Sequence, residues 1–124
     1  MSFNEDILAR AIANPYFREV LSTGPHCQVV VMSIPVGGEI GEEVHQAVDQ
    51  VLVGVMGEGL AVLEGQRSPM GPGHLVHVPA GTRHNLVNSG PTDLKLYTVY
   101  APPQHAVGTI HRTKAEADAS EEHY

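Results

Sequence analysis

Residues 73–88, GHLVHVPAGTRHNLVN, carry the most informative pattern in this sequence. A Val-rich run ends at Pro79, a Pro-Ala-Gly turn follows, and a second run resumes near His84. Short apolar runs separated by glycine and proline are typical of antiparallel strands joined by tight turns. The pattern therefore predicts two strands, with a histidine placed just after the turn between them.

The same alternation of short runs and turns extends on both sides, from Tyr16 to about Ala101. Many short strands at close spacing indicate an all-β sandwich or barrel. The predicted strands are 17–22, 26–34, 42–46, 48–56, 59–64, 74–78, 83–88 and 93–101. We interpret residues 59–64 as the return strand of a hairpin that turns at Gly57-Glu58.

A short helix is predicted on each side of this β region. Apolar residues recur at helical spacing over residues 3–13, and Ser2 with Glu5 has the spacing of a capping box. Thr113 with Glu116 has the same spacing and predicts one or two helical turns near the C-terminus.

The domain organisation expected from the sequence is simple. It contains no internal repeat, low-complexity tract or linker. We therefore expect one domain over residues 1–124, with a barrel core at about 16–101 and a polar C-terminal tail at 102–124. A chain of 124 residues can bury a single core without disulfide bonds.

Composition and charge argue against several classes of partner. The formal net charge is −7 and the basic residues are scattered, so we expect no binding to nucleic acid. The N-terminus is acidic and lacks the apolar segment of a secretory signal, and no apolar run is long enough to span a membrane. Cys27 is the single cysteine, which fits a reducing compartment. We expect a cytoplasmic protein without membrane contacts.

A second informative segment extends from Gly37 to Gly57. Glu43 and His45 are two residues apart, so on an extended strand both side chains point to one face. Gln50 follows at the start of an apolar run. The segment therefore places a carboxylate and an imidazole side by side, with an amide close in sequence.

In these two segments the sequence resembles the cupin superfamily. The second cupin motif is Gly, five residues, Pro, one residue, Gly, two residues, His, three residues, Asn. Every fixed position is matched here, by Gly73, Pro79, Gly81, His84 and Asn88.

The first cupin motif is matched in part. It is Gly, five residues, His, one residue, His, three or four residues, Glu, six residues, Gly. Gly37, His45 and Gly57 match it, Glu43 stands at the position of the first His, and Gln50 stands at the position of the Glu. The resemblance extends to small bacterial single-domain cupins and implies a cupin-type double-stranded β-helix, which is a jelly-roll barrel.

The resemblance implies one divalent metal ion, with Glu43, His45, Gln50 and His84 as its ligands. The two imidazoles, the carboxylate and the amide oxygen suit Fe, Mn, Co, Ni or Zn. The set is also similar to the two-histidine, one-carboxylate sites of non-heme iron enzymes. Because it contains a single carboxylate, a bound divalent ion would keep a net positive charge that favours an anionic substrate or metal-bound hydroxide.

Alternatives remain open for the ligands. Glu43 is either a ligand or a solvated residue of an acidic loop that also holds Glu39 and Glu42. Gln50 is either a ligand or a hydrogen-bonding group behind the ligands. Asp49 fits the shorter motif spacing, although strand alternation turns it to the opposite face. The histidines themselves could be remnants in a cupin that binds no metal.

Candidate substrate contacts are polar residues near the second motif and on the last strand. They are Arg83, Lys95, Tyr97, Tyr100 and His77. Tyr97 and Tyr100 have opposite parity on one strand, so at most one should face the interior. The direction of His77 depends on the strand register. His105 and His111 follow the barrel strands and could cover one mouth.

Two functions are compatible with the predicted barrel and its candidate metal site. The favoured one is a metal-dependent enzyme that acts on a small polar molecule, through isomerase or lyase chemistry with a Lewis acid or as a dioxygenase-type oxygenase. Glu43, where it is not a ligand, is the best candidate for a catalytic acid or base. The alternative is a non-enzymatic module that binds or senses a small, sugar-like ligand, and the weak ligand Gln50 favours it.

The resemblance also implies a homodimer. Cupin barrels commonly pair through an edge strand or an added terminal strand. Residues 17–22 or the N-terminal helix could serve that role here.

Overall fold

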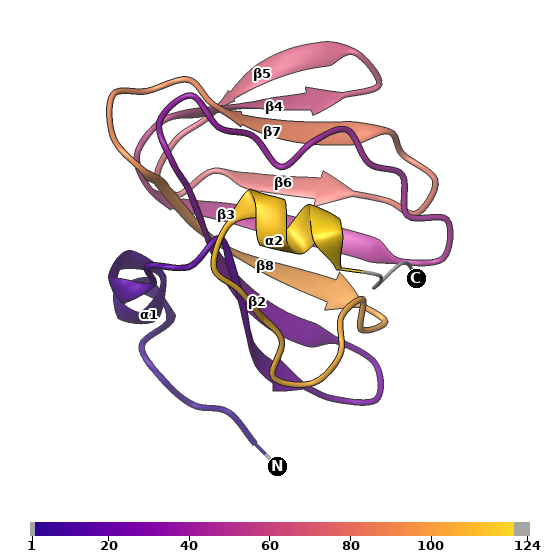
Figure 1. Cartoon of the computed structure of the whole chain (residues 1–124). Helices are drawn as coiled ribbons and strands as arrows, with labels where there is room; N and C mark the ends of the chain where they lie inside the picture. Colours follow the sequence, from indigo (N-terminus) through magenta and orange to yellow (C-terminus); the bar gives the residue numbers. More distant parts are fainter. Residues whose placement is uncertain (1, 121–124) are drawn as a thin grey trace.

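The computed structural model describes residues 2–120 as two facing antiparallel β-sheets flanked by two short helices (Figure 1). In chain order the elements are α1 (Ile7–Ala13), β1 (Arg18–Thr23), β2 (Gln28–Ile34), β3 (Asp49–Met56), β4 (Gly59–Leu63), β5 (Gln66–Met70), β6 (Leu75–Val78), β7 (His84–Asn88), β8 (Leu94–Ala101), β9 (Ile110–His111) and α2 (Lys114–Ala119). The predicted C-terminal tail is thus described as far as residue 120. No helix within residues 2–120 has the length and apolar character needed to cross a bilayer.

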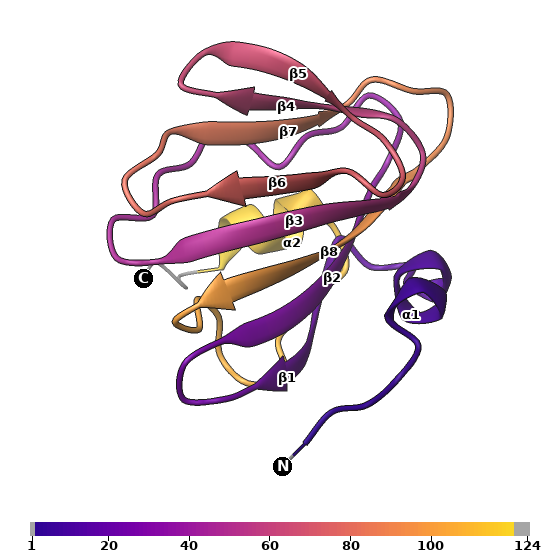
Figure 2. The ribbon, with the colours of Figure 1, turned by 180° about the vertical axis from the view of Figure 1, so that it is seen from behind.

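The two sheets form the layers of a sandwich, which Figures 1 and 2 show from opposite sides. The larger sheet has the strand order β6-β3-β8-β2-β1-β9, and the smaller has the order β5-β4-β7. The order is not sequential, because the chain crosses between the layers, as it does from β3 to β4. This is a jelly-roll β-sandwich, which confirms the predicted fold class.

The core lies between the layers and follows from strand alternation. Burial alternates along β3 and β7, so one face of each strand turns inward. Most of the side chains that are fully inaccessible to solvent are apolar, among them Met32, Ile34, Met70, Leu94 and Leu96. Burying each such side chain contributes roughly 1.5–3 kcal/mol.

Two glycines of the cupin motifs are required by backbone geometry. Gly57 has φ +89°, and a Cβ atom there would lie 2.4 Å from the carbonyl oxygen of Asp93. Gly81 has φ +85° in the turn before β7. Both positions are in the left-handed region, where side chains other than hydrogen are strained. These motif positions therefore shape the barrel.

Asn88 of the second motif also has a structural role. Its Nδ2 donates to the carbonyl oxygens of Ile34 and Thr92, each at 2.9 Å, and its Oδ1 accepts from the amide of Gly90 at 2.9 Å. The side chain is 4% exposed. Asn88 thus fastens the turn between β7 and β8 to the end of β2.

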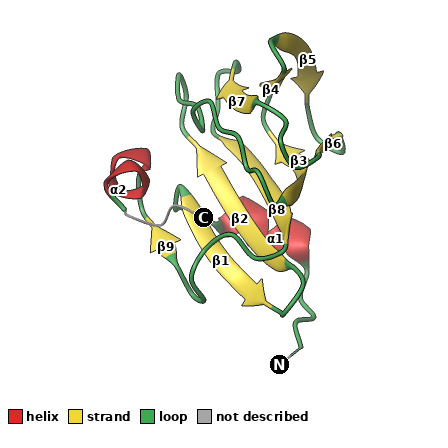
Figure 3. Cartoon of the chain, turned by 90° about the vertical axis from the view of Figure 1, so that its right-hand side faces the viewer, coloured by secondary structure: helices red, strands yellow, loops and turns green. Residues whose placement is uncertain are grey.

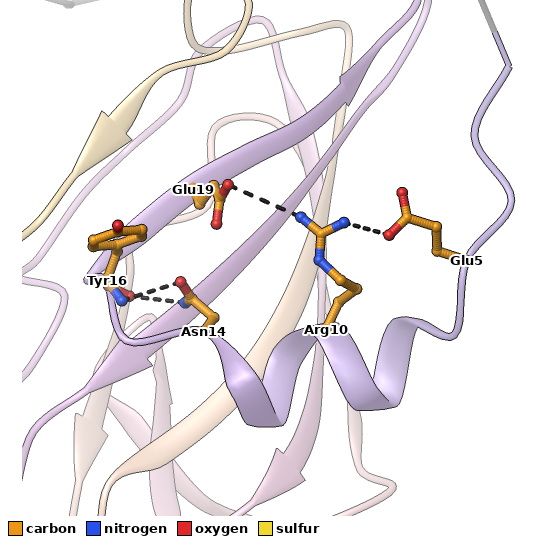
Figure 4. Close-up of polar contacts among 5 residues, drawn as sticks. All are labelled: Glu5, Arg10, Asn14, Tyr16 and Glu19. Carbon is orange, nitrogen blue, oxygen red and sulfur yellow. Dashed lines mark hydrogen bonds and ion pairs between the residues drawn. The ribbon is translucent and has the colours of Figure 1, made fainter.

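Helix α1 is shorter than predicted and has a different cap. Asp6, rather than the Ser2–Glu5 pair, caps it by accepting from the amide of Ala9 at 3.1 Å, so the helix begins at Ile7 and not at residue 3. After its last turn, Asn14 and Tyr16 exchange two hydrogen bonds of 2.8 and 3.0 Å (Figure 4).

Polar contacts hold helix α1 against β1 and cap the start of helix α2. Arg10 pairs with Glu5 and lies 3.9 Å from the carboxylate of Glu19 on β1 (Figure 4). For α2 the expected capping residue is confirmed, since Thr113 accepts from the amide of Glu116 at 3.1 Å.

Two expectations about the strands are wrong, and two strands were missed. Residues 59–64 do not return as a hairpin on β3, because β4 pairs with β5 and β7 in the other sheet. Residues 42–46 form no regular strand and make only an isolated bridge at Glu43. Strands β5 and β9 were not predicted: β5 is an exposed edge strand that contains Pro69, and β9 has only two residues.

Candidate functional site

The loop over residues 38–45 brings the first cupin motif against the second. Glu43 and His84 exchange backbone hydrogen bonds of 2.8 and 2.9 Å, and the carbonyl of His45 accepts from the amide of Gly81 at 2.8 Å. The loop therefore runs along the free edge of β7 as an irregular extra strand. Residues that are some forty positions apart in sequence become neighbours in this way.

The side chains of Glu43, His45 and His84 converge on the inner side of this contact. The Nε2 atom of His45 lies 3.5 Å from Oε2 of Glu43, and the rings of His45 and His84 are 5.2 Å apart between centroids. Nδ1 of His84 is 2.9 Å from the carbonyl oxygen of Thr82. Because a carbonyl only accepts, Nδ1 carries the proton and Nε2 keeps a free lone pair. His84 is thus held in the tautomer that a ligand needs.

Gln50 faces the same space from β3. It is 2% exposed, and its Nε2 donates to the hydroxyl of Thr98 at 3.0 Å. Its Oε1 is buried and accepts no hydrogen bond from any residue in 2–120. Gln50 stands opposite Tyr100 in the β3–β8 ladder, and the Tyr100 ring lies 6.1 Å from that of His45. A buried acceptor without a donor costs about 1–3 kcal/mol, so its orientation requires an explanation.

Asp49, the alternative to Gln50, lies outside the site. It is exposed, and its Oδ1 accepts from the amide of Ala80 at 2.8 Å. The adjacent residues 49 and 50 thus point to opposite faces, as strand alternation requires. Asp49 holds the turn at residues 79–81 from outside the barrel.

Burial governs the ionisation of the groups around the site. It lowers the pKa of His45, opposed by the charge of Glu43 and reinforced by His84 and Arg18. Burial likewise lowers the pKa of His105 to about 3, with further contributions from Arg18, His111 and His45. For Tyr100, burial is the main cause of a raised pKa, so the phenol keeps its proton. Neutral imidazoles are therefore favoured at neutral pH for His45 and His105.

The donor types fit a divalent transition metal. Two atoms that are each about 2.1 Å from one ion in a tetrahedral arrangement lie about 3.4 Å apart, and the Glu43–His45 separation is 3.5 Å. The unpartnered oxygen of Gln50 and the tautomer of His84 agree with a ligand role. No three His, Cys, Asp or Glu side chains within residues 2–120 gather closely enough to hold an ion on their own.

A cavity of about 510 Å³ opens beside Glu43 and His45, whereas His84 and Gln50 do not line it. Glu43 and His45 lie on one wall, and the C-terminal segment supplies the other through Gln104, His105, His111 and helix α2. Figure 1 shows α2 in front of β3 and β8, and Figure 3 shows it joined to the barrel through β9. The cavity has the size of a typical small-molecule site, which is about 300–1,000 Å³. The expectation that His105 and His111 lie at one mouth agrees with this wall.

Of the predicted substrate contacts, the structure brings Tyr100 to the site. Its side chain is 2% exposed and lies between the rings of His45 and His105. Lys95 is turned to the other face of the sheet, where its Nζ donates to the carbonyl of Asn14 at 2.7 Å. Tyr97 shares the parity of Lys95 and is half-buried on that face.

The remaining two candidates lie on the surface. Arg83 is exposed and does not line the 510 Å³ cavity, although its guanidinium pairs at 2.9 Å with Glu42, which does. His77 is an exposed residue of β6, opposite Val51 in the ladder. Neither side chain lines the cavity that contains Glu43 and His45.

Arg18 lines the cavity and was not found from the sequence. It is 7% exposed, and its Nη1 lies 3.1 Å from Nδ1 of His111. One signal could have identified it, because Arg18 and the buried Val20 share the same parity on β1. An arginine at an inward position of a strand is unusual and marks a polar interior.

The fold and the site together define a jelly-roll protein with a histidine-containing cavity at one end of its barrel. The model of the cupin domain family matches residues 30–100, and the chain belongs to this family. The resemblance seen in the two motifs is thereby confirmed.

Two similar proteins and one solved structure show what the chain resembles. The uncharacterized protein YrkC of Bacillus subtilis is 47% identical over 116 residues, which are 88% of this chain and 62% of YrkC, so the chain spans less than two thirds of that relative. An uncharacterized protein of Acanthamoeba polyphaga mimivirus is 34% identical, over 93% of this chain and 74% of its own. The crystal structure of BH2720 from Bacillus halodurans is 41% identical with a TM-score of 0.95, covering 97% of this chain and 96% of that one.

Proposed function

We propose that the chain is a metal-dependent enzyme that acts on a small polar molecule in the 510 Å³ cavity, with Glu43, His45, Gln50 and His84 holding one divalent ion of Fe, Mn, Co, Ni or Zn. Two observations support the proposal: the proximity of Glu43, His45 and His84, and the buried, unpartnered oxygen of Gln50 on the neighbouring strand β3. When bound, such an ion would act as a Lewis acid on a substrate oxygen or, in a dioxygenase-type reaction, would bring O2 to the substrate. The isomerase, lyase and dioxygenase types of reaction all remain within the proposal.

The residues of the chain supply the remaining chemistry. The carboxylate of Glu43 is partly exposed to the cavity, so it can take a proton from a bound molecule where it does not act as a ligand. The phenol of Tyr100 keeps its proton and can donate a hydrogen bond beside His45. The C-terminal wall, including α2, limits the access of water to these groups.

Metal content tests the proposal directly. Protein purified without added metal should contain close to one divalent ion per chain by mass spectrometry of the elements, because the donor set is selective for such ions. His45→Ala should lose the ion, and His77→Ala, which removes an exposed histidine outside the site, should retain it. Crystals of the metal-bound protein with anomalous scattering would identify the ligands. Equal metal content in wild type and His45→Ala would refute the site.

A metal-free binding module is the second candidate, and one observation favours it. The described residues provide no cluster of three His, Cys, Asp or Glu side chains that could hold a metal, and the amide oxygen of Gln50 is a weak ligand. In that case the cavity would hold a sugar-like molecule through hydrogen bonds. Wild-type protein without metal that still binds a neutral sugar would support this alternative over the enzyme.

We also propose a homodimer. The edge of β1 is already occupied at Arg18 and Glu19 by β9, which leaves less of residues 17–22 for a partner. Helix α1 exposes Leu8 and Ile12, so it is the better candidate surface. Light scattering at micromolar concentration should give twice the chain mass, and Leu8→Glu should give a monomer.

The single-domain organisation and the cytoplasmic location stay predictions.

A further inference from the structure

The cavity contains a buried positive charge that none of the residues discussed so far balances. Arg18 extends inward from β1 and is 7% exposed. Its Nη1 contacts Nδ1 of His111 at 3.1 Å, and its guanidinium lies 5.3 Å from the centre of the Phe17 ring. The Nε–H group has no hydrogen-bond acceptor within residues 2–120.

The other charges of the cavity have partners nearby. At the mouth, the ammonium of Lys114 lies 2.7 Å from the carboxylate of Asp118. On the opposite wall, Glu43 lies 3.5 Å from His45. Arg18 makes no ion pair with any carboxylate of the described residues. A buried guanidinium without a carboxylate is costly, because water and a counter-ion are both removed from it.

The charge of Arg18 acts on the groups of the proposed active site. Burial is the main cause of the low pKa values of His45 and His105, and the positive charge of Arg18 adds to both shifts. The charge of Arg18 also opposes the effect of burial on the pKa of Tyr100. The guanidinium therefore lies within electrostatic reach of the same space as Glu43 and His45.

We propose that Arg18 is the anion-binding residue of the cavity and that the natural ligand is a small molecule carrying a carboxylate or phosphate group. The free Nε–H and the planar guanidinium offer a fork of donors, which matches the two oxygens of such a group. With its anionic end on Arg18, the ligand extends toward Glu43 and His45 within the 510 Å³ volume. This inference names the substrate class of the proposed enzyme and rests on that proposed function for its catalytic meaning.

The test uses full-length protein treated with EDTA, so that it does not depend on metal. The probes are acetate, inorganic phosphate and acetamide, which is the neutral analogue of acetate. The readout is the ¹H–¹⁵N resonance of the Arg18 Nε–H group, together with backbone amides that line the cavity. Acetate or phosphate should shift these signals in a saturable way, and acetamide should not. The more strongly bound anion identifies which group the ligand carries.

Matched variants separate an anion site from a structural arginine. Arg18→Met should weaken anion binding by about tenfold or more, and Arg18→Lys, which keeps the charge but loses the fork, should retain part of it. Lys95→Met is the control, because it removes another buried cation, one whose amine contacts Asn14 on the other face of the sheet. Its anion binding should equal that of the wild type.

The outcomes distinguish this inference from the metal proposal. Binding of acetamide as tight as that of acetate, equal anion binding in Arg18→Met, or no saturable binding by wild-type protein would each overturn the role of Arg18. None of these results changes the metal content of the untreated protein. Conversely, wild-type protein that lacks metal but shows Arg18-dependent anion binding would refute the metal site and leave the anion site in place.

Discussion

The same strands form both ends of the barrel interior, but apolar side chains fill one end and polar side chains line the other. At one end β2 and β8 pair Ile34 with Leu94 and Met32 with Leu96, and all four are fully buried. Further along the same ladder Val30 faces Thr98 and Gln28 faces Tyr100. We call these the apolar end and the polar end. The change from apolar to polar side chains occurs between Leu96 and Thr98 on β8 and between Val30 and Gln28 on β2.

This difference indicates that the residues that stabilise the fold and the residues available to a ligand occupy different ends of the same strands. The apolar end is closely packed, since Ile34, Leu94 and Leu96 are fully inaccessible to solvent. The polar end leaves about 510 Å³ and keeps an acceptor of Gln50 without a donor. Close packing stabilises one end, whereas unsatisfied groups at the other are available to a ligand.

The largest effect is expected at the apolar end. Leu96→Ala should lower the free energy of unfolding by about 3 kcal/mol or more, because Leu96 is fully buried and its neighbours cannot close the space. Urea denaturation followed by circular dichroism measures this change. Leu75→Ala is the control, since Leu75 is 62% exposed and should change stability by less than about 0.5 kcal/mol. Similar losses in the two variants would contradict the assignment of the stabilising core to this end.

The next effect concerns metal at the polar end. A divalent ion at about one hundred times its dissociation constant should stabilise the folded chain by about 2.7 kcal/mol, since the unfolded chain does not assemble the ligands. Thermal unfolding with and without EDTA measures it. In His84→Ala the EDTA effect should disappear, because the imidazole that Thr82 orients is gone. An EDTA effect of the same size in that variant would place the metal elsewhere.

Helix α1 is outside both ends and gives a reference for surface contributions. Asp6→Ala should cost about 1 kcal/mol, because the amide of Ala9 loses its acceptor. Arg10→Ala, which removes the exposed contacts of Figure 4, should cost about 0.5 kcal/mol or less. Urea midpoints of the two variants measure the difference. The cap prediction fails if Arg10→Ala is the more destabilising change.

Local signals predicted most of the fold, and tertiary pairing accounts for what they missed. The strands around His84 and Asn88 were found because turn residues bound them on both sides. The path after Gly57 was misjudged, because a tight turn does not reveal whether the chain returns to the same sheet or crosses to the other. Strand β5 was missed because it is exposed and lacks the alternation that a buried face imposes.

The candidate site shows the same division between local and tertiary information. Motif spacing brought His45 and His84 together correctly, since their rings lie 5.2 Å apart. Lys95 was wrongly kept as a candidate, although parity would have excluded it once Tyr100 was taken as the inward residue, because the two are an odd number of positions apart. The wall that contains Arg18 and His111 depends on the pairing of β1 with β9, and a two-residue strand leaves no pattern in the sequence.

The smallest change in stability is expected where the functional consequence is large. In metal-free protein, Gln50→Leu removes the donor to Thr98, which costs about 1 kcal/mol, and also removes the buried, unpartnered Oε1, which returns a similar amount. The free energy of unfolding should therefore stay within about 1 kcal/mol of the wild type, while metal content falls because one ligand is lost. Urea denaturation in EDTA and elemental analysis of untreated protein measure the two quantities. A loss of several kcal/mol in EDTA would show that Oε1 has a stabilising partner in the metal-free fold, and the polar end would then be a packed core like its opposite.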